Sequence, residues 1–159
     1  MAKRIKMLSG IPDLPPSLVC EDGTKVRLLP LEKTGGKALY VSADGRCYSY
    51  WFRTGADLPC GSFLRQLKPQ DDTSKTNRFN AHRKQKYLRM TSYGNILVHI
   101  AVAIAWIGPR PKDENGIPFE CHHLNGITKD NRVENLIWLS RAQHKIYDAQ
   151  LRASQKSQH

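Results

Sequence analysis

The stretch that decides the fold is Pro118–Asp148, which reads PFECHHLNGITKDNRVENLIWLSRAQHKIYD. Two short runs in it, Phe119–His123 and Leu136–Leu139, are typical of strands. The polar segment between them carries the turn signals Asn125-Gly126 and Asp130-Asn131, and Asn131 is interpreted as a turn residue. The pattern therefore predicts two strands joined by a polar loop.

A helix is expected over 141 to about 153, because Ser140 is a good N-cap. His122 and His123 end the first predicted strand, and His144 lies in the first turns of this helix. If the helix packs on the strands, His144 can approach His122, and two imidazoles with open coordination positions form a catalytic type of metal site. His123 would then stand free of the metal and could act as a general base on water, because a histidine pKa lies near working pH.

These residues and their spacing resemble the HNH endonuclease family. The family pattern is a His pair or Asp-His, then an Asn that precedes Leu, then a His or Asn nine positions after that Asn. Here His123 is followed at +12 by Asn135, which precedes Leu136, and at +21 by His144. This spacing and the string NRVENLIWLS look like the phage and intron-encoded homing branch of the family.

Two upstream strings are also similar to that branch. LVHIAVAIAWIG (97–108) resembles a helix of the branch, although Ile100 stands where that pattern carries a basic residue. YVSADGRCYS (40–49) looks like a small module often placed ahead of such nuclease domains. The resemblance is strong over 96–147 and weak over 38–50.

The resemblance implies an α+β fold with a ββα-metal (His-Me finger) nuclease core and a β-rich N-terminal region. It implies that His122 and His144 are metal ligands and that His123 is the general base. Asn135 would hold the hairpin loop by backbone hydrogen bonds and orient His123. One divalent metal ion per site is implied, from among Mn, Co, Ni, Zn and Mg. The implied reaction is metal-dependent hydrolysis of DNA phosphodiester bonds, by nicking or double-strand cleavage, with a 5′ phosphate and a 3′ hydroxyl as products.

The charge of the chain points to the same class of partner. Lys and Arg number 25 against 14 Asp and Glu, and the formal net charge of +11 favours polyanions. The basic strip 65–89 is interpreted as facing phosphates, because Lys and Arg release counterions when they bind nucleic acid, and a solvated charged face is the alternative. The residues expected to contact DNA are Arg83, Lys84, Lys86, Arg89, Arg132, Arg141 and Lys145. For the last three, plain exposed charge is the alternative.

The chain divides into five segments by composition: an extended basic arm over 1–20, a small β-rich module over 21–64, a basic DNA-facing loop and strand region over 65–95, a core helix with the nuclease motif over 96–153, and a tail over 154–159. Asp44-Gly45 between two apolar runs is a hairpin signal. A core helix is expected over 96–107, and His99 at its start is interpreted as a satisfied buried or capping histidine.

The four cysteines, at 20, 47, 60 and 121, form no C-x-x-C pair and are interpreted as reduced thiols of a cytoplasmic protein, in a bacterial or phage-infected cell. A structural zinc site that uses Cys47 and Cys60 stays open. The longest apolar stretch, Ile96–Ile107, is shorter than the ~20 residues of a membrane span, so no membrane partner is expected.

The sequence therefore predicts an endonuclease that acts on double-stranded DNA as a monomer or homodimer. The alternative is a non-catalytic basic ββα DNA-binding protein whose metal is structural. A structural site would want four ligands, and the sequence indicates only His122 and His144. An RNA-binding or RNA-processing protein is compatible with the charge.

Overall fold

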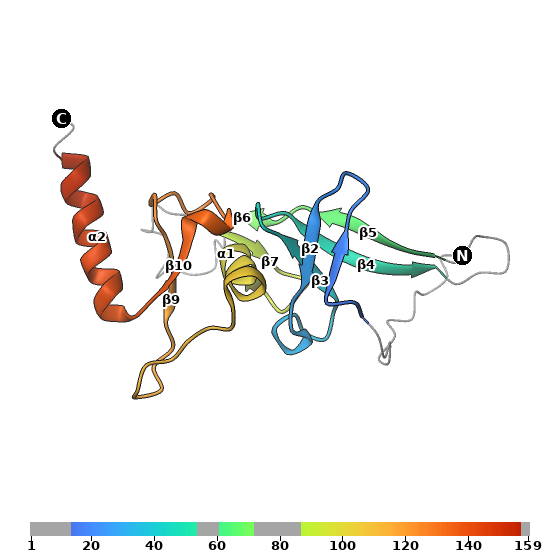
Figure 1. Ribbon diagram of the computed structural model, residues 1–159, viewed down its shortest axis with the longest axis horizontal. Coiled ribbons are helices and arrows are strands. Elements are labelled where there is room, and N and C mark those ends of the chain that lie inside the picture. Colours follow the sequence, from blue (N-terminus) through green and yellow to red (C-terminus); the bar gives the residue numbers. More distant parts are fainter. Residues whose placement is uncertain (1–13, 54–60, 72–86, 157–159) are drawn as a thin grey trace.

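The computed structural model describes residues 14–53, 61–71 and 87–156, and they form a mixed α and β structure (Figure 1). The elements along these ranges are β1 (Ser17–Val19), β2 (Lys25–Leu28), a 3-10 turn (Leu31–Lys33), β3 (Leu39–Ser42), β4 (Cys47–Arg53), β5 (Gly61–Leu67), β6 (Gln70–Asp71), β7 (Leu88–Met90), β8 (Ile96–Leu97), α1 (Val98–Val102), a π-helical turn (Ala103–Ile107), β9 (Glu120–His123), a second 3-10 turn (Val133–Asn135), β10 (Leu136–Leu139) and α2 (Arg141–Lys156). This mixture confirms the predicted α+β class. No helix within these ranges is long and apolar enough to cross a membrane.

The N-terminal part is a five-stranded antiparallel sheet in the order β1-β2-β3-β4-β5. The predicted hairpin at Asp44-Gly45 is confirmed, because β3 pairs with β4 and Gly45 takes the left-handed φ of +88° that the turn requires.

Of the predicted N-terminal arm, residues 1–13 lie outside the described residues. Ser17–Val19 pairs with β2 as the edge strand β1, so this part of the arm belongs to the sheet.

The predicted core helix is shorter than its apolar run. Ile96 and Leu97 pair with β7 as strand β8, so the α-helical turns begin at Val98 and continue as the π-helical turn to Ile107. Gly108 ends this segment with a φ of +138°. The strands β6, β7 and β8 form a three-stranded sheet, and β8 directly precedes α1 in the chain.

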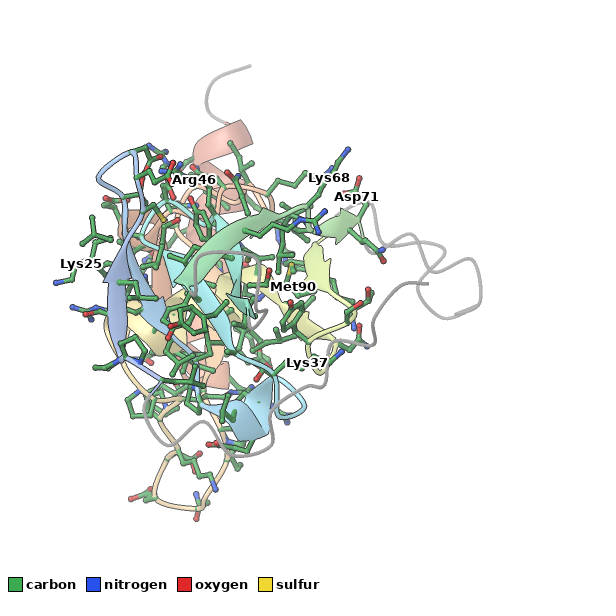
Figure 2. The ribbon with its side chains drawn as sticks, turned by 90° about the vertical axis from the view of Figure 1, so that its right-hand side faces the viewer. Lys25, Lys37, Arg46, Lys68, Asp71 and Met90 are labelled. Carbon is green, nitrogen blue, oxygen red and sulfur yellow. The ribbon has the colours of Figure 1, made fainter. Side chains whose placement is uncertain are left out.

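Both sheets pack on α1 around one core. Its buried members are Leu29, Leu39, Val41, Cys47, Met90, Val98, Ala101, Val102 and Leu136. Figure 2 shows Met90 in the interior, whereas Lys25 and Lys68 lie at the periphery. Trp106 Nε1 donates to the Val41 carbonyl at 3.1 Å, which also ties the helical segment to β3. The N-terminal sheet is therefore fixed against the C-terminal part through a shared core.

The C-terminal part is the predicted strand–loop–strand–helix unit. β9 and β10 form an antiparallel hairpin in which His123 is opposite Leu136 and His122 is opposite Ile137. The Ser140 cap is confirmed as a capping box, because Gln143 N donates to Ser140 Oγ at 3.3 Å and Ser140 N donates to Gln143 Oε1 at 2.9 Å. From this cap α2 runs to Lys156, into the predicted tail, at the end of the molecule away from the five-stranded sheet (Figure 1).

Among the described cysteines, Cys20, Cys47 and Cys121 are free thiols. Cys47 lies in the core, and burial raises the pKa of its thiol to about 12, so the thiol is protonated. Cys60 lies outside the described residues, and with it the proposed Cys47–Cys60 zinc pair.

Candidate active site

His122 and His144 meet between the hairpin and α2. Neighbouring residues of a strand point to opposite faces, and His122 is the one that faces α2. Its Nδ1 lies 3.2 Å from Nε2 of His144, and the two rings meet edge-on with centroids 4.7 Å apart. The structure therefore brings together the two imidazoles that the sequence assigned to a metal.

Asp148 joins these two histidines and was not predicted from the sequence. It lies one helical turn after His144, and its Oδ2 is 3.2 Å from His144 Nδ1 while its Oδ1 is 4.0 Å from His122 Nδ1. Each of the three side chains offers one ligand atom, and these atoms all lie within 4.8 Å of one another. The i, i+4 spacing from His144 on a predicted helix was the signal that could have identified Asp148.

The chemistry of this donor set fits a divalent metal. Burial lowers the pKa of His122, and the nearby His144 lowers it further, so the His122 imidazole is neutral and has a lone pair to offer. Two imidazoles with one carboxylate match catalytic sites, in which three protein ligands leave a position open for water or substrate. In the part of the chain that the structure describes, no other group of three such side chains is found.

Glu120 lies beside this group of three, at the start of β9. Its Oε2 is 3.9 Å from His144 Nε2, and its Oε1 is 3.9 Å from Nε of Arg141. Arg141 is the first residue of α2 and its side chain is 73% exposed, so its contact with Glu120 leaves most of it open to solvent. Glu120 adds a second carboxylate at the edge of the site.

His123 lies on the opposite face of the hairpin and is buried. Its Nε2 is 3.1 Å from Oδ1 of Asn131. An amide oxygen can only accept a hydrogen bond, so Nε2 carries the proton and Nδ1 keeps the lone pair. Burial lowers the pKa of His123, and the hydrogen bond that its ring donates to Asn131 and the charge of Asp130 oppose that effect.

Two aromatic rings line His123 on the side of α1. The ring centroid of His99 is 4.9 Å from that of His123, and that of Tyr87 is 6.1 Å away. The prediction that His99 is buried is confirmed, but the prediction that it is satisfied is wrong, because its buried Nδ1 has no hydrogen-bond partner among the described residues. Burial lowers the pKa of His99 to about 3, so it is a neutral ring against His123.

Asn135 holds the loop between the two strands. Its Oδ1 accepts from the Asn125 backbone N at 2.9 Å, and its Nδ2 donates to Asn125 Oδ1 at 2.9 Å and to the Asp130 carbonyl at 2.8 Å. The side chain that touches His123 is that of Asn131, which the sequence indicated only as a turn residue. A turn signal says nothing about which side chain the folded loop turns inward.

The residues expected to contact DNA differ in their surroundings. Arg132 makes two hydrogen bonds of 2.8 Å to the carboxylate of Asp130, so its charge is already paired. Lys145 is exposed on α2, and Arg89 lies half-buried in β7. Arg83, Lys84 and Lys86 lie outside the described residues.

Residues 97–146 match the family model described as HNH endonuclease. This segment contains α1, β9, β10 and the first turns of α2, whereas Asp148 lies just beyond it. No curated protein and no solved structure matches the chain. The match supports the HNH family and a ββα-metal core for this segment. At the level of that family it indicates a nuclease, with a nucleic acid as substrate and a divalent metal as the usual cofactor.

Proposed function

We propose that this protein is a metal-dependent DNA endonuclease of the homing or phage type, which hydrolyses phosphodiester bonds by nicking or double-strand cleavage. The observation that carries the proposal is that the adjacent β9 residues His122 and His123 belong to two different chemical groups. One is the three-residue donor set of His122, His144 and Asp148, and the other is the His123–Asn131 pair. Hydrolysis with a separate base requires a metal donor set and a histidine that does not ligate the metal.

His122, His144 and Asp148 would hold the metal. A divalent ion bound there supplies Lewis-acid stabilisation of the charge that develops on the phosphate. Imidazole suits Mn, Co, Ni and Zn better than Mg, and the carboxylate of Asp148 adds a harder oxygen ligand. A closed structural site needs four protein ligands, so three ligands favour a catalytic site over the non-catalytic alternative.

His123 is proposed as the general base. Its Nδ1 would take a proton from the attacking water, while Nε2 stays bonded to Asn131 and so keeps the ring in one tautomer. His99 packs edge-on against the ring of His123 with centroids 4.9 Å apart, and its lowered pKa makes it a neutral neighbour. Attack of this water on phosphorus with the 3′ oxygen as the leaving group would leave a 5′ phosphate and a 3′ hydroxyl.

Double-stranded DNA is the proposed partner. The net charge of +11 attracts the phosphate backbone, and the exposed Lys145 and Arg141 lie on the same helix as two of the proposed ligands. One such site cuts one strand, so a double-strand break requires a homodimer or two successive nicks by a monomer. The proposed compartment is the cytoplasm.

The test is cleavage of a supercoiled plasmid by the full chain, with chelator and with added Mn²⁺, for the wild type and His123→Ala. We expect nicked or linear product from the metal-loaded wild type, and a rate lower by about 10²–10⁴ in the variant. His159→Ala is the matched control and should cleave like the wild type. A metal-loaded wild type that binds DNA without cutting it would replace this proposal with the DNA-binding alternative, and cleavage restricted to RNA would replace the substrate.

A further inference from the structure

The turn between β3 and β4 packs against the loop that carries Asn131. Val133 N donates to the carbonyl of Ala43 at 2.8 Å, so the two segments are joined through their backbones. Gly45 lies directly against Asn131, and a Cβ placed on Gly45 would be 3.0 Å from Asn131 Cβ and 3.2 Å from Asn131 O. A Cβ at position 45 would be in tighter contact than usual, so Asn131 would have to move by a few tenths of an ångström.

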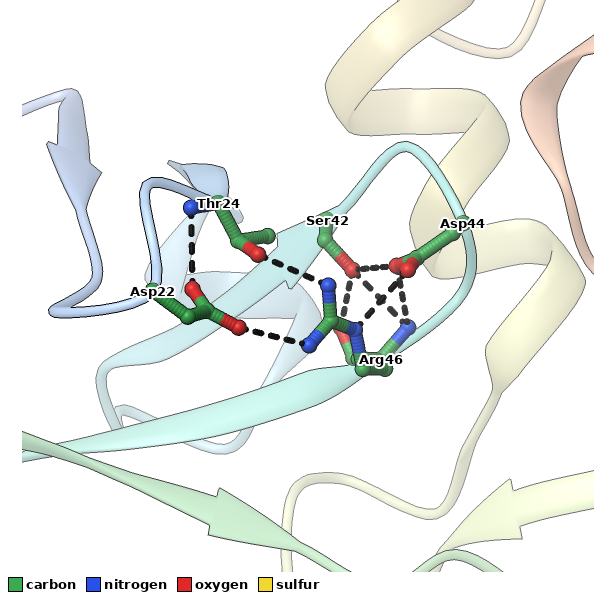
Figure 3. Close-up of polar contacts among 5 residues, drawn as sticks. All are labelled: Asp22, Thr24, Ser42, Asp44 and Arg46. Atoms are coloured by element: carbon green, nitrogen blue, oxygen red, sulfur yellow. Dashed lines mark hydrogen bonds and ion pairs between the residues drawn. The ribbon is translucent and has the colours of Figure 1, made fainter.

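The same turn is held in shape by a polar network (Figure 3). Ser42 donates from its hydroxyl to Asp44, and Arg46 Nε donates to Asp44 Oδ2 at 2.8 Å. The Arg46 guanidinium also reaches the turn between β1 and β2, where it donates to Asp22 Oδ2 at 3.1 Å and to Thr24 Oγ1 at 2.7 Å. These bonds therefore tie the turn that contacts Asn131 to the neighbouring turn of the same sheet.

On its other side, Asn131 bonds His123. Both residues are 5% exposed, so neither side chain has space to take another position without moving its neighbours. Gly45 therefore contacts Asn131, and Asn131 in turn is hydrogen-bonded to Nε2 of His123. A displacement of the turn would move Asn131 and so disturb the hydrogen bond that sets the tautomer of His123.

We propose that the β3–β4 turn is a positioning element of the active site, with Gly45 as its positioning residue. The N-terminal sheet thus completes the site by fixing Asn131, which fixes the ring of His123. The inference rests on the proposed function, in which His123 is the base. It adds that a nuclease segment without this sheet would keep the metal ligands but lose the orientation of the base.

The central experiment compares Gly45→Ala with Gly36→Ala. Gly36 has a φ of +77°, close to the +88° of Gly45, but a Cβ at position 36 would meet nothing within 4 Å. Both variants therefore introduce the same kind of backbone strain, and only one introduces a contact. We expect Gly45→Ala to lower kcat by about 10–100-fold, since small misplacements in a site can cost that much, while KM and Mn²⁺ affinity stay within about twofold. Gly36→Ala should retain wild-type kcat, and an equal loss in both variants would overturn the inference.

A double-mutant cycle separates action through Asn131 from a general structural effect. If Gly45 acts through the Asn131 side chain, adding Gly45→Ala to Asn131→Ala should lower kcat by less than about twofold further. Multiplicative losses would show that the turn acts by another route and would contradict the proposal. Gly45→Asn serves as a second variant if Gly45→Ala fails to fold, because Asn tolerates a positive φ yet still introduces a Cβ.

A spectroscopic measurement decides the inference independently of cleavage. In ¹⁵N-labelled protein, the ring nitrogens of His123 should report protonation at Nε2 in the wild type and in Gly36→Ala. In Gly45→Ala or Gly45→Asn, we expect the Nε2 signal to shift as the bond to Asn131 is lost. An unchanged signal would overturn the positioning role. A wild type that cleaves nothing, with the expected shift in the variants, would reject the proposed function and leave the positioning inference standing.

Discussion

The Nε2 atom of His123 lies 3.1 Å from Oδ1 of Asn131, and both side chains are buried. This pair gives His123 one defined tautomer, with the lone pair on Nδ1. On the other face of the same strand, His122 lies against His144 and Asp148. Because adjacent residues of a strand point to opposite faces, the candidate base His123 and the candidate metal ligand His122 lie on opposite sides of one hairpin.

The first prediction concerns Asn131. Asn131→Ala removes the acceptor for Nε2, so the His123 ring can rotate or take the other tautomer, and we expect kcat to fall about 10–100-fold. Asn131→Asp keeps an acceptor at the same place and should retain more activity than the alanine variant. Single-turnover plasmid cleavage measures the difference, and equal activity in Asn131→Ala and the wild type would remove Asn131 from the mechanism.

The second prediction concerns the donor set. His122→Ala, His144→Ala and Asp148→Ala should each lower Mn²⁺ affinity, and the Asp148 change should cost about 10–100-fold even if Asp148 acts only by orienting His144. Calorimetric titration of the metal is the measurement. Glu120→Gln is the neighbouring control and should have a smaller effect, because its carboxylate lies 3.9 Å from His144 Nε2. Unchanged affinity in the two histidine variants would show that the ligand assignment is wrong.

The third prediction concerns the identity of the metal. Two imidazoles and one carboxylate should bind Mn, Co, Ni or Zn more tightly than Mg, so a transition metal should co-purify at least in part. Zinc can hold a four-coordinate geometry that excludes the phosphate, so the tightest ion need not give the fastest cleavage. Metal analysis and cleavage assays across these ions provide the check. A strict Mg requirement without transition-metal binding would count against a site built on His122 and His144.

The fourth prediction concerns the basic strip. Changing Arg83, Lys84 and Lys86 together to Gln should weaken binding to all duplexes alike and flatten the slope of log affinity against log salt by up to about 2.7, at ~0.9 per phosphate contact. The charge-conserving triple of Arg83→Lys, Lys84→Arg and Lys86→Arg should keep the slope. If the Gln variant has the wild-type slope, the strip is only a solvated surface.

The fifth prediction concerns stability at low pH. Burial lowers the pKa of His99 to about 3 from 6.5, so the unfolded chain binds a proton that the folded protein excludes. The stability is therefore complete above pH 6.5 and falls as the pH drops toward 3, by up to about 1.4 kcal/mol per pH unit from this residue. His99→Phe should reduce that slope when unfolding is followed by denaturant titration at several pH values. His159→Phe should leave the slope unchanged, and an unchanged slope in His99→Phe would mean that His99 titrates normally.

The sequence by itself determined the local elements around the site. The strand runs before His123 and after Asn135, the Ser140 cap and the Asp44-Gly45 turn all appear in the structure, because each depends on residues close together in the chain. It also placed His122 and His144 within reach of each other, since a short hairpin followed at once by a helix has few ways to pack. The roles of these two histidines stay predictions.

Only the tertiary structure decided which side chains complete the site. Asn131 turns inward to His123, and Gly45 packs on Asn131, although neither contact follows from periodicity or turn signals. His99 faces His123 because α1 and the hairpin share one core with the N-terminal sheet. Local patterns report backbone preferences of neighbouring residues, whereas contacts between distant segments follow from how the buried faces fit together.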